Sequence, residues 1–72
     1  MTDLEYMIEG ATRDLTVMLM ERKDMKMTVA LDTLYNSETY QKLSDPRSGL
    51  YFQSPGYVYD FLEKEIQYGK MR

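Results

Sequence analysis

Apolar residues recur every three or four positions through most of the chain, which is the spacing of an amphipathic α-helix. In the first third of the chain the repeat is made by Leu4, Ile8, Ala11, Leu15 and Met18. Acidic residues open this segment and basic residues close it, as the helix macrodipole favours. The pattern predicts one long helix over residues 3–22, with Thr2 as its N-cap and Glu5 bonding back to Thr2 in a capping box.

A second apolar set with the same helical spacing follows a short polar joint. Its members are Met27, Ala30, Leu31, Leu34 and Tyr35. We expect a second helix over about residues 26–36, with this set as its inward stripe. Asp24 and Thr28 are both suited to be its N-cap, and the sequence does not choose between them.

The polar pair Asn36 and Ser37 interrupts the helical pattern, because Asn36 suits a C-cap and Ser37 suits an N-cap. A short third helix is therefore expected over residues 38–44. Residues 44–49 contain one Pro, one Gly and two Ser, which predicts a loop. The next three residues, 50–52, are too few to show a period, so they form either a packed loop or a stub of extended chain.

Ser54 and Pro55 form a strong helix start, with serine as N-cap and proline at the first helical position. The inward stripe that follows consists of Val58, Phe61, Leu62 and Ile66. We expect a last helix over residues 55–68, ended by Gly69. The whole chain, residues 1–72, is thus expected to be a single all-α domain, a small bundle of three to four helices.

Length and composition limit how stable such a domain can be. The chain has 72 residues and contains no Cys and no His. A lone core of this size supplies roughly 3–5 kcal/mol, and neither a disulfide nor a zinc site of the usual kind can add to it. Self-association, for example as a homodimer, or binding to a protein partner would supply more.

The same absences exclude most catalytic chemistry at neutral pH. Without His or Cys there is no imidazole base, no thiolate nucleophile and no imidazole metal ligand. We therefore expect no enzymatic activity, no cofactor and no bound metal. A formal net charge of −3 argues against binding to nucleic acid, because phosphate contacts need clustered Lys and Arg. No apolar run reaches the roughly 20 residues of a membrane span, and the acidic N-terminus lacks signal-peptide features, so a cytoplasmic location is expected.

Methionines and aromatic residues are unevenly placed along the chain. Six of the seven Met lie in residues 1–27, and eight of the nine aromatic residues lie in residues 35–72. The Met-rich end of the first helix and the aromatic group of the second half are candidates for a partner-binding surface. These candidates are Val17, Met18, Met20, Tyr51, Phe52, Tyr57 and Tyr59. Tyr57 and Tyr59 diverge by about 200° on a helix, and we expect Tyr59 to be the partly exposed one.

The two middle helices, over residues 27–35 and 38–44, have the outline of a helix-turn-helix motif. The second of them would present Glu38, Thr39, Gln41 and Lys42 to DNA. Major-groove recognition needs phosphate anchors around such residues, whereas this set holds one Lys and one Glu. A dimeric DNA-binding regulator is therefore the alternative interpretation, and two core helices meeting at a capped corner is the favoured one.

Residues 30–66 carry a recognisable pattern, beginning Leu34-Tyr35-Asn36-Ser37 and continuing through Gly49-Leu50-Tyr51 to Tyr57-Val58-Tyr59. This stretch resembles a small uncharacterised family from gut anaerobic bacteria with a "YNSxTYxxL…GLYxxSxxYVYxxL" pattern. The resemblance implies a place in gene clusters that look like toxin–antitoxin loci, and hence a neutralising, protein-binding role. The favoured function is a non-enzymatic protein–protein interaction module, as the acidic partner of such a pair or as a homodimer.

Overall fold

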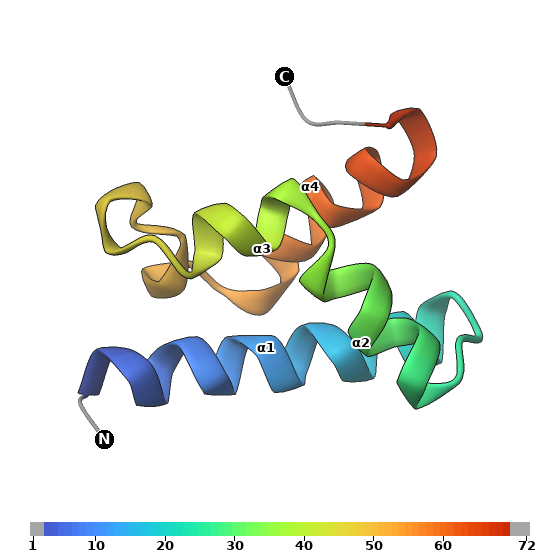
Figure 1. Ribbon diagram of the computed structural model, residues 1–72, viewed down its shortest axis with the longest axis horizontal. Helices are drawn as coiled ribbons and strands as arrows, with labels where there is room; N and C mark the ends of the chain where they lie inside the picture. The colour runs from blue at the N-terminus through green and yellow to red at the C-terminus, as the bar shows by residue number, and fades with distance from the viewer. Residues whose placement is uncertain (1–2, 70–72) are drawn as a thin grey trace.

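The computed structural model describes residues 3–69, and within that range the chain is helical and contains no β-strand. Figure 1 shows its elements, which are α1 (Asp3–Arg22), α2 (Met27–Tyr35), α3 (Glu38–Leu43), the 3-10 turns η1 (Pro46–Ser48) and η2 (Leu50–Phe52), and α4 (Pro55–Tyr68). The expected all-α class and its four helices are confirmed, with bounds that agree to within one residue. The predicted cap at Thr2 lies outside the described residues.

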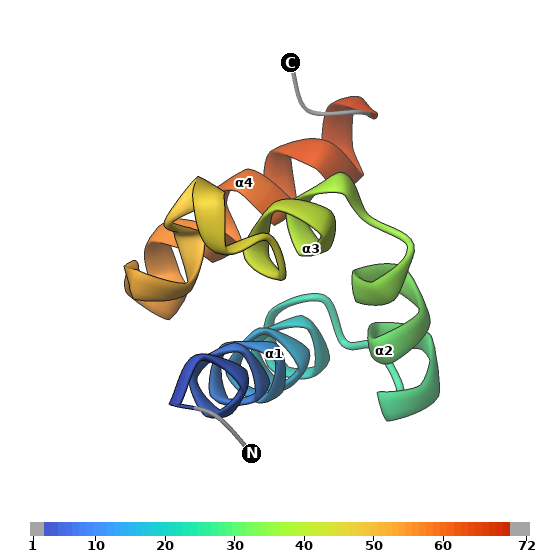
Figure 2. The ribbon, with the colours of Figure 1, turned by 60° about the vertical axis from the view of Figure 1, so that its left-hand side comes forward.

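The helices form two layers. In Figures 1 and 2, α1 and α2 lie on one side, whereas α3, the two 3-10 turns and α4 lie on the other. Helix α1 packs against α2, α4 and η2, and α3 packs against α2 and α4. Among the described residues, the buried apolar side chains that form the core are Leu15, Leu19, Ala30, Leu34, Leu43, Val58, Tyr59 and Leu62.

Two serine caps set the starts of α3 and α4. The Ser37 hydroxyl accepts a hydrogen bond from the Tyr40 backbone N–H at 3.0 Å, and Ser54 accepts one from the Tyr57 N–H at 3.3 Å. Each bond satisfies an N–H that has no partner within its own helix, which is worth about 1 kcal/mol. Asn36 is the C-cap of α2. The expected roles of Ser37, Ser54 and Asn36 are confirmed.

The start of α2 differs from both expectations. Its N-cap is Lys26, which makes no capping hydrogen bond through its side chain, so neither Asp24 nor Thr28 has that role. Asp24 instead turns the chain, with a left-handed φ of 56° that Asp tolerates better than most residues. Residues 50–52 are not extended but form the turn η2, which begins after Gly49 at a φ of 73°.

The inward stripe expected for α2 is only partly buried. Ala30 and Leu34 are fully buried, but Met27 is 56% exposed and Tyr35 is 51% exposed. A helix can present different residues to different neighbours. Positions 27, 31 and 35 follow one another at four-residue spacing and form a second stripe beside the buried pair Ala30 and Leu34. The expectation that Met27 and Tyr35 point into the core is therefore wrong.

A carboxylate of α4 holds the start of α3. Glu65 accepts hydrogen bonds from the Glu38 N–H at 2.7 Å, the Thr39 N–H at 3.0 Å and the Thr39 hydroxyl at 2.8 Å. A carboxylate at a helix N-terminus satisfies free N–H groups and interacts favourably with the helix dipole. Helix α3 lies across Glu65, so this residue is not on the solvent side of α4.

Replacing Glu65 by Gln should lower the free energy of unfolding by about 1–3 kcal/mol, because the amide nitrogen faces donors where a carboxylate oxygen accepted. Glu63→Gln is the matched control. Glu63 forms an ion pair with Lys23 at 3.3 Å across a partly exposed surface, and such pairs contribute roughly 0–1 kcal/mol. Urea unfolding followed by circular dichroism measures both variants. Equal losses for the two would contradict the capping role of Glu65.

Candidate interaction surface

An apolar groove of about 580 Å³ lies between α1 and α2. Helix α1 contributes Val17 and Met20 to its lining, and Tyr40 of α3 completes it. The α2 side consists of Met27, Leu31 and Tyr35, which are the second stripe of that helix. Val17, 43% exposed, faces the same groove as the half-exposed Met27 and Tyr35, so water-exposed apolar side chains border it from both helices.

The polar groups on the α1 side of the groove are satisfied within the helix. The Thr12 hydroxyl donates to the Ile8 carbonyl at 2.7 Å, and the Thr16 hydroxyl donates to the Thr12 carbonyl at 2.8 Å. Both threonines line the groove and are buried. Because these hydroxyls already have acceptors, an apolar partner that covers the groove leaves no unpaired threonine donor behind.

Two aromatic rings order the α2 and α3 side of the groove. The rings of Tyr35 and Tyr40 meet edge to face, with their centroids 4.9 Å apart and an interplanar angle of 88°. Such pairs contribute about 0.5–1.5 kcal/mol beyond the area they bury. The exposed Tyr35 ring is therefore held in place by its neighbour and offers a rigid contact surface to a partner.

Glu9 and Arg13 are the charged residues of the groove lining. They lie one helical turn apart on α1 and are both exposed. Their spacing suits an ion pair within one helix, and the sequence predicts one. Within residues 3–69, however, neither Glu9 nor Arg13 takes part in an ion pair. Both charges therefore remain accessible at the groove.

The sequence identified part of this surface. Two of the candidates for partner contact, Val17 and Met20, line the groove. Met18 does not line it, and both Met18 and Met20 are half-buried and pack against the core. The contribution of α2 was missed because its apolar residues were all assigned to one inward stripe. Helical spacing does not separate the two sets, because Met27 lies only about 20° from the buried Leu34 around the helix. The division depends on which side of α2 its neighbours cover.

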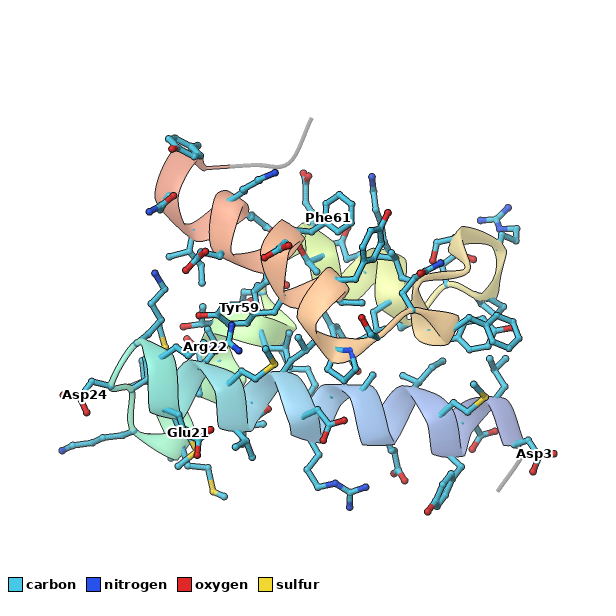
Figure 3. All side chains as sticks on the ribbon, turned by 180° about the vertical axis from the view of Figure 1, so that it is seen from behind. Asp3, Glu21, Arg22, Asp24, Tyr59 and Phe61 are labelled. Carbon is cyan, nitrogen blue, oxygen red and sulfur yellow. The ribbon has the colours of Figure 1, made fainter. Side chains whose placement is uncertain are left out.

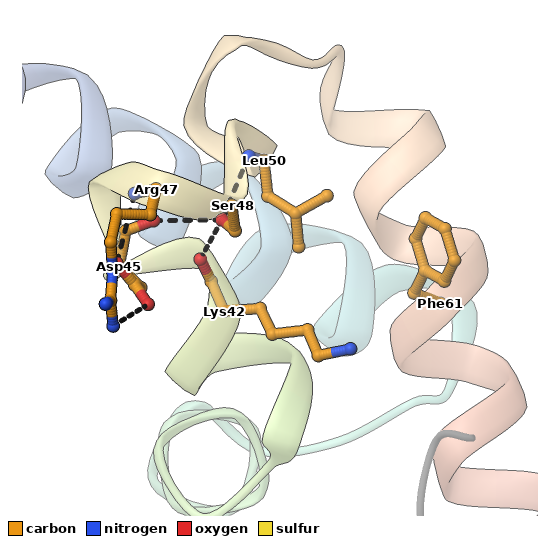
Figure 4. Close-up of a pocket in the computed structure, with 6 residues that line it drawn as sticks. All are labelled: Lys42, Asp45, Arg47, Ser48, Leu50 and Phe61. Carbon is orange, nitrogen blue, oxygen red and sulfur yellow. Dashed lines mark hydrogen bonds and ion pairs between the residues drawn. The ribbon is translucent and has the colours of Figure 1, made fainter.

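A second, open depression of about 620 Å³ lies between α3, the 3-10 turns and α4. Figure 4 shows the Lys42 side chain of α3 extended along this depression toward Phe61 of α4. Leu50 lies between α3 and α4. Arg47 and Asp45, which also line it, form an ion pair at 3.1 Å. Hydrogen bonds from the Arg47 side chain and backbone hold the pKa of the Asp45 carboxyl below its usual value. This pairing satisfies the two charges locally.

The predicted aromatic patch is divided in the structure. Phe52 is 69% exposed and Tyr57 is 48% exposed, whereas Tyr51 packs partly against the core. The Tyr51 and Phe52 rings lie 4.3 Å apart, and Tyr57 contacts Phe61 edge to face at 5.2 Å. Phe52 and Tyr57 thus remain candidates for contact, while Tyr51 has a structural role as well.

Tyr59 is a core residue, and the expectation that it is exposed and binds a partner is wrong. Its side chain is 1% exposed, and Figure 3 shows it between α4 and α1, beside Arg22. The Arg22 guanidinium carbon lies 5.0 Å from the centre of the ring, a cation–π distance. The buried arc of α4 is centred on Leu62, and both Val58 and Tyr59 fall within roughly 60° of it. Tyr57 is therefore the residue that faces outward.

The helix-turn-helix interpretation loses one of its four reading residues to the core, and Glu38 is only partly exposed. Thr39 is fully buried, and Glu65 binds the backbone N–H groups of Glu38 and Thr39. Gln41 and Lys42 are the exposed members of the set. A six-residue helix with two exposed side chains of this kind offers few groups for contacts with base edges in a DNA groove.

Among residues 3–69, no three His, Cys, Asp or Glu side chains come together in a way that could hold a metal ion. In the same part of the chain, no helix has the length and apolar character to cross a membrane. Comparisons with protein-family models, with curated proteins and with solved structures give no match for this chain.

The environment of Tyr59 leads to a prediction about stability. Within the described residues its buried hydroxyl has no hydrogen-bond partner, and such a group costs about 1–3 kcal/mol. Tyr59→Phe should therefore raise the free energy of unfolding by about 1 kcal/mol. Tyr59→Ser should lower it by roughly 3–5 kcal/mol, because it leaves a large cavity.

Tyr57→Phe is the control and should change the free energy of unfolding by less than about 0.5 kcal/mol. Thermal unfolding of the three variants measures these differences. A harmless Tyr59→Ser change would show that Tyr59 is not in the core.

Proposed function

We propose that this protein is a non-enzymatic protein–protein interaction module, and that it docks its partner in the groove between α1 and α2. The observation that carries the proposal is the second stripe of α2, whose Met27 and Tyr35 stay more than half exposed beside Val17 of α1. Adjacent exposed apolar side chains of this size are typical of binding surfaces in a soluble protein.

The shape and the chemistry of the groove suit an amphipathic helix. Two helices form its sides, and a third helix laid between them would place apolar residues at helical spacing against Val17 and Met27. The methionines supply adaptable contacts, and the Tyr35 ring supplies a rigid one. Glu9 and Arg13 at the groove would orient the partner by charge.

A second candidate partner, besides another copy of the chain, is a basic protein, which the net charge of −3 suits. Such a partner is the toxin-like protein that the resemblance of residues 30–66 implies. Its gene would lie beside the gene for this chain, which makes the neighbouring gene product the natural partner to test.

The double variant Met27→Ser with Tyr35→Ser removes the two most exposed apolar residues of the groove. We expect at least a tenfold weaker association, because exposed aromatic and methionine anchors dominate interface energies. The matched control is Val29→Ser with Tyr68→Ser, which removes exposed residues that do not line the groove. Sedimentation velocity measures each protein alone and mixed with the neighbouring gene product.

The control should associate within about twofold of the unmodified chain. The proposal fails if the groove variant and its control associate equally well. It also fails if the unmodified chain neither self-associates nor binds the neighbouring gene product at high micromolar concentration.

A further inference from the structure

We infer that the partner which occupies the groove is a second copy of this chain, with the two α1 helices packed antiparallel about a two-fold axis. The inference rests on the proposed function and names its partner. It follows from three features of α1, which are the placement of its two groove charges, the position of Gly10 and the exposure of Tyr6.

The two groove charges of α1 are complementary to themselves. Glu9 and Arg13 have opposite signs, lie four residues apart and have no ion-pair partner within residues 3–69. A two-fold axis that crosses α1 midway between them places Glu9 of each copy opposite Arg13 of the other. One interface then contains two ion pairs, as the isologous contact of a symmetric dimer requires. Any partner without this symmetry would need its own matching pair of charges.

Gly10 follows Glu9 in the chain, near the middle of a 20-residue helix, and lies about 60° around the helix from Arg13. Glycine there destabilises the helix relative to alanine. Packing within the chain does not account for it, because an added Cβ would meet only the Arg13 guanidinium, at an ordinary contact distance of 3.9 Å. A glycine on an uncovered helix face lets the backbone of a second helix approach closely, which is the role that the two-fold axis gives it.

Apolar residues flank the charges on the same face of α1. Tyr6 precedes Glu9 by three residues and Val17 follows Arg13 by four, so all four lie along one side of the helix. Tyr6 is 67% exposed. The axis that pairs Glu9 with Arg13 brings Tyr6 of one copy opposite Val17 of the other, and each ion pair is then bordered by an apolar contact.

The position of the axis also gives the two helices nearly full overlap. It crosses α1 level with residue 11, close to the middle of Asp3–Arg22. Residues 3–19 of one helix then lie along residues 3–19 of the other. A 20-residue helix is about 30 Å long, which matches the 31 Å longest dimension of the molecule. The contact therefore runs along the whole length of the protein and covers the α2 stripe beside it.

The test uses charge reversal in the full chain. Glu9→Arg and Arg13→Glu should each weaken the dimer at least about tenfold, because each places two pairs of like charges across the interface. A mixture of the two variants should form a heterodimer with a dissociation constant within about threefold of the unmodified dimer, since both pairs become attractive again. The double variant Glu9→Arg with Arg13→Glu should likewise restore the homodimer.

Glu21→Arg and Lys64→Glu are the matched controls, since both positions are exposed, neither lines the groove and neither lies within residues 3–19 of α1. They should dimerise as the unmodified chain does. Sedimentation equilibrium and native mass spectrometry of the separate and mixed variants measure all of these states, and circular dichroism verifies that each is folded.

Three results would overturn the inference. The first is a monomeric unmodified chain, the second is equal dimerisation by the Glu9, Arg13 and control variants, and the third is failure of the mixture to recover. The proposed function is judged separately. If these results occur and Met27→Ser with Tyr35→Ser still abolishes binding to the neighbouring gene product, the groove is a docking surface for that partner and not for a second copy.

Discussion

The rest of this structure depends on the packing of α1, which contacts α2 in its own layer and α4 and η2 in the other layer. Leu15 and Leu19 are fully buried on one side of that helix, and the core residues of α2 and α4 meet there. Each covering element is short, since α2 has nine residues and α4 has fourteen. Both α2 and α4 thus pack on the single long helix α1. The apolar side chains that these shorter helices do not cover stay in contact with water.

The exposed apolar surface of the protein follows from that limit. The chain is too small to enclose every apolar side chain, because surface grows relative to volume as a domain shrinks. Helix α2 buries Ala30 and Leu34 and leaves Met27 and Tyr35 outside. Among the described residues, three of the ten large apolar side chains that stay exposed meet in the groove between α1 and α2, where threonine hydroxyls are already satisfied. The meeting of these three side chains, Val17, Met27 and Tyr35, favours a contact at this groove.

Local sequence signals account for most of the helix bounds. Ser37 and Ser54 act within three residues of themselves, so their capping roles are readable from the neighbouring sequence. The signal at Glu65 is different in kind, because its hydrogen bonds reach Thr39, which is 26 residues away. Nothing in the sequence around Glu65 shows that α3 crosses it. Lys26, the N-cap of α2, makes no capping hydrogen bond through its side chain, so the sequence carries no capping pattern at the start of this helix.

The candidate site was likewise predictable only where local sequence determines the exposure of a side chain. The exposure of Val17 follows from its place off the α1 stripe, whereas the burial of Tyr59 depends on how α4 rotates to face α1. Helical spacing alone allowed either Tyr57 or Tyr59 to face outward, and the choice is made by tertiary packing. Similarly, the division of α2 into a buried and an exposed stripe depends on α1 covering one side of it only.

The central claim is that the surplus apolar face of α1 and α2 is covered by a second copy of the chain. The most direct test is sedimentation equilibrium of the unmodified protein over a concentration range from about 5 to about 500 μM, because mass action populates a dimer as concentration rises. The account predicts that the mass rises toward twice the 8.6 kDa of the chain. A mass of 8.6 kDa across the whole range would contradict it.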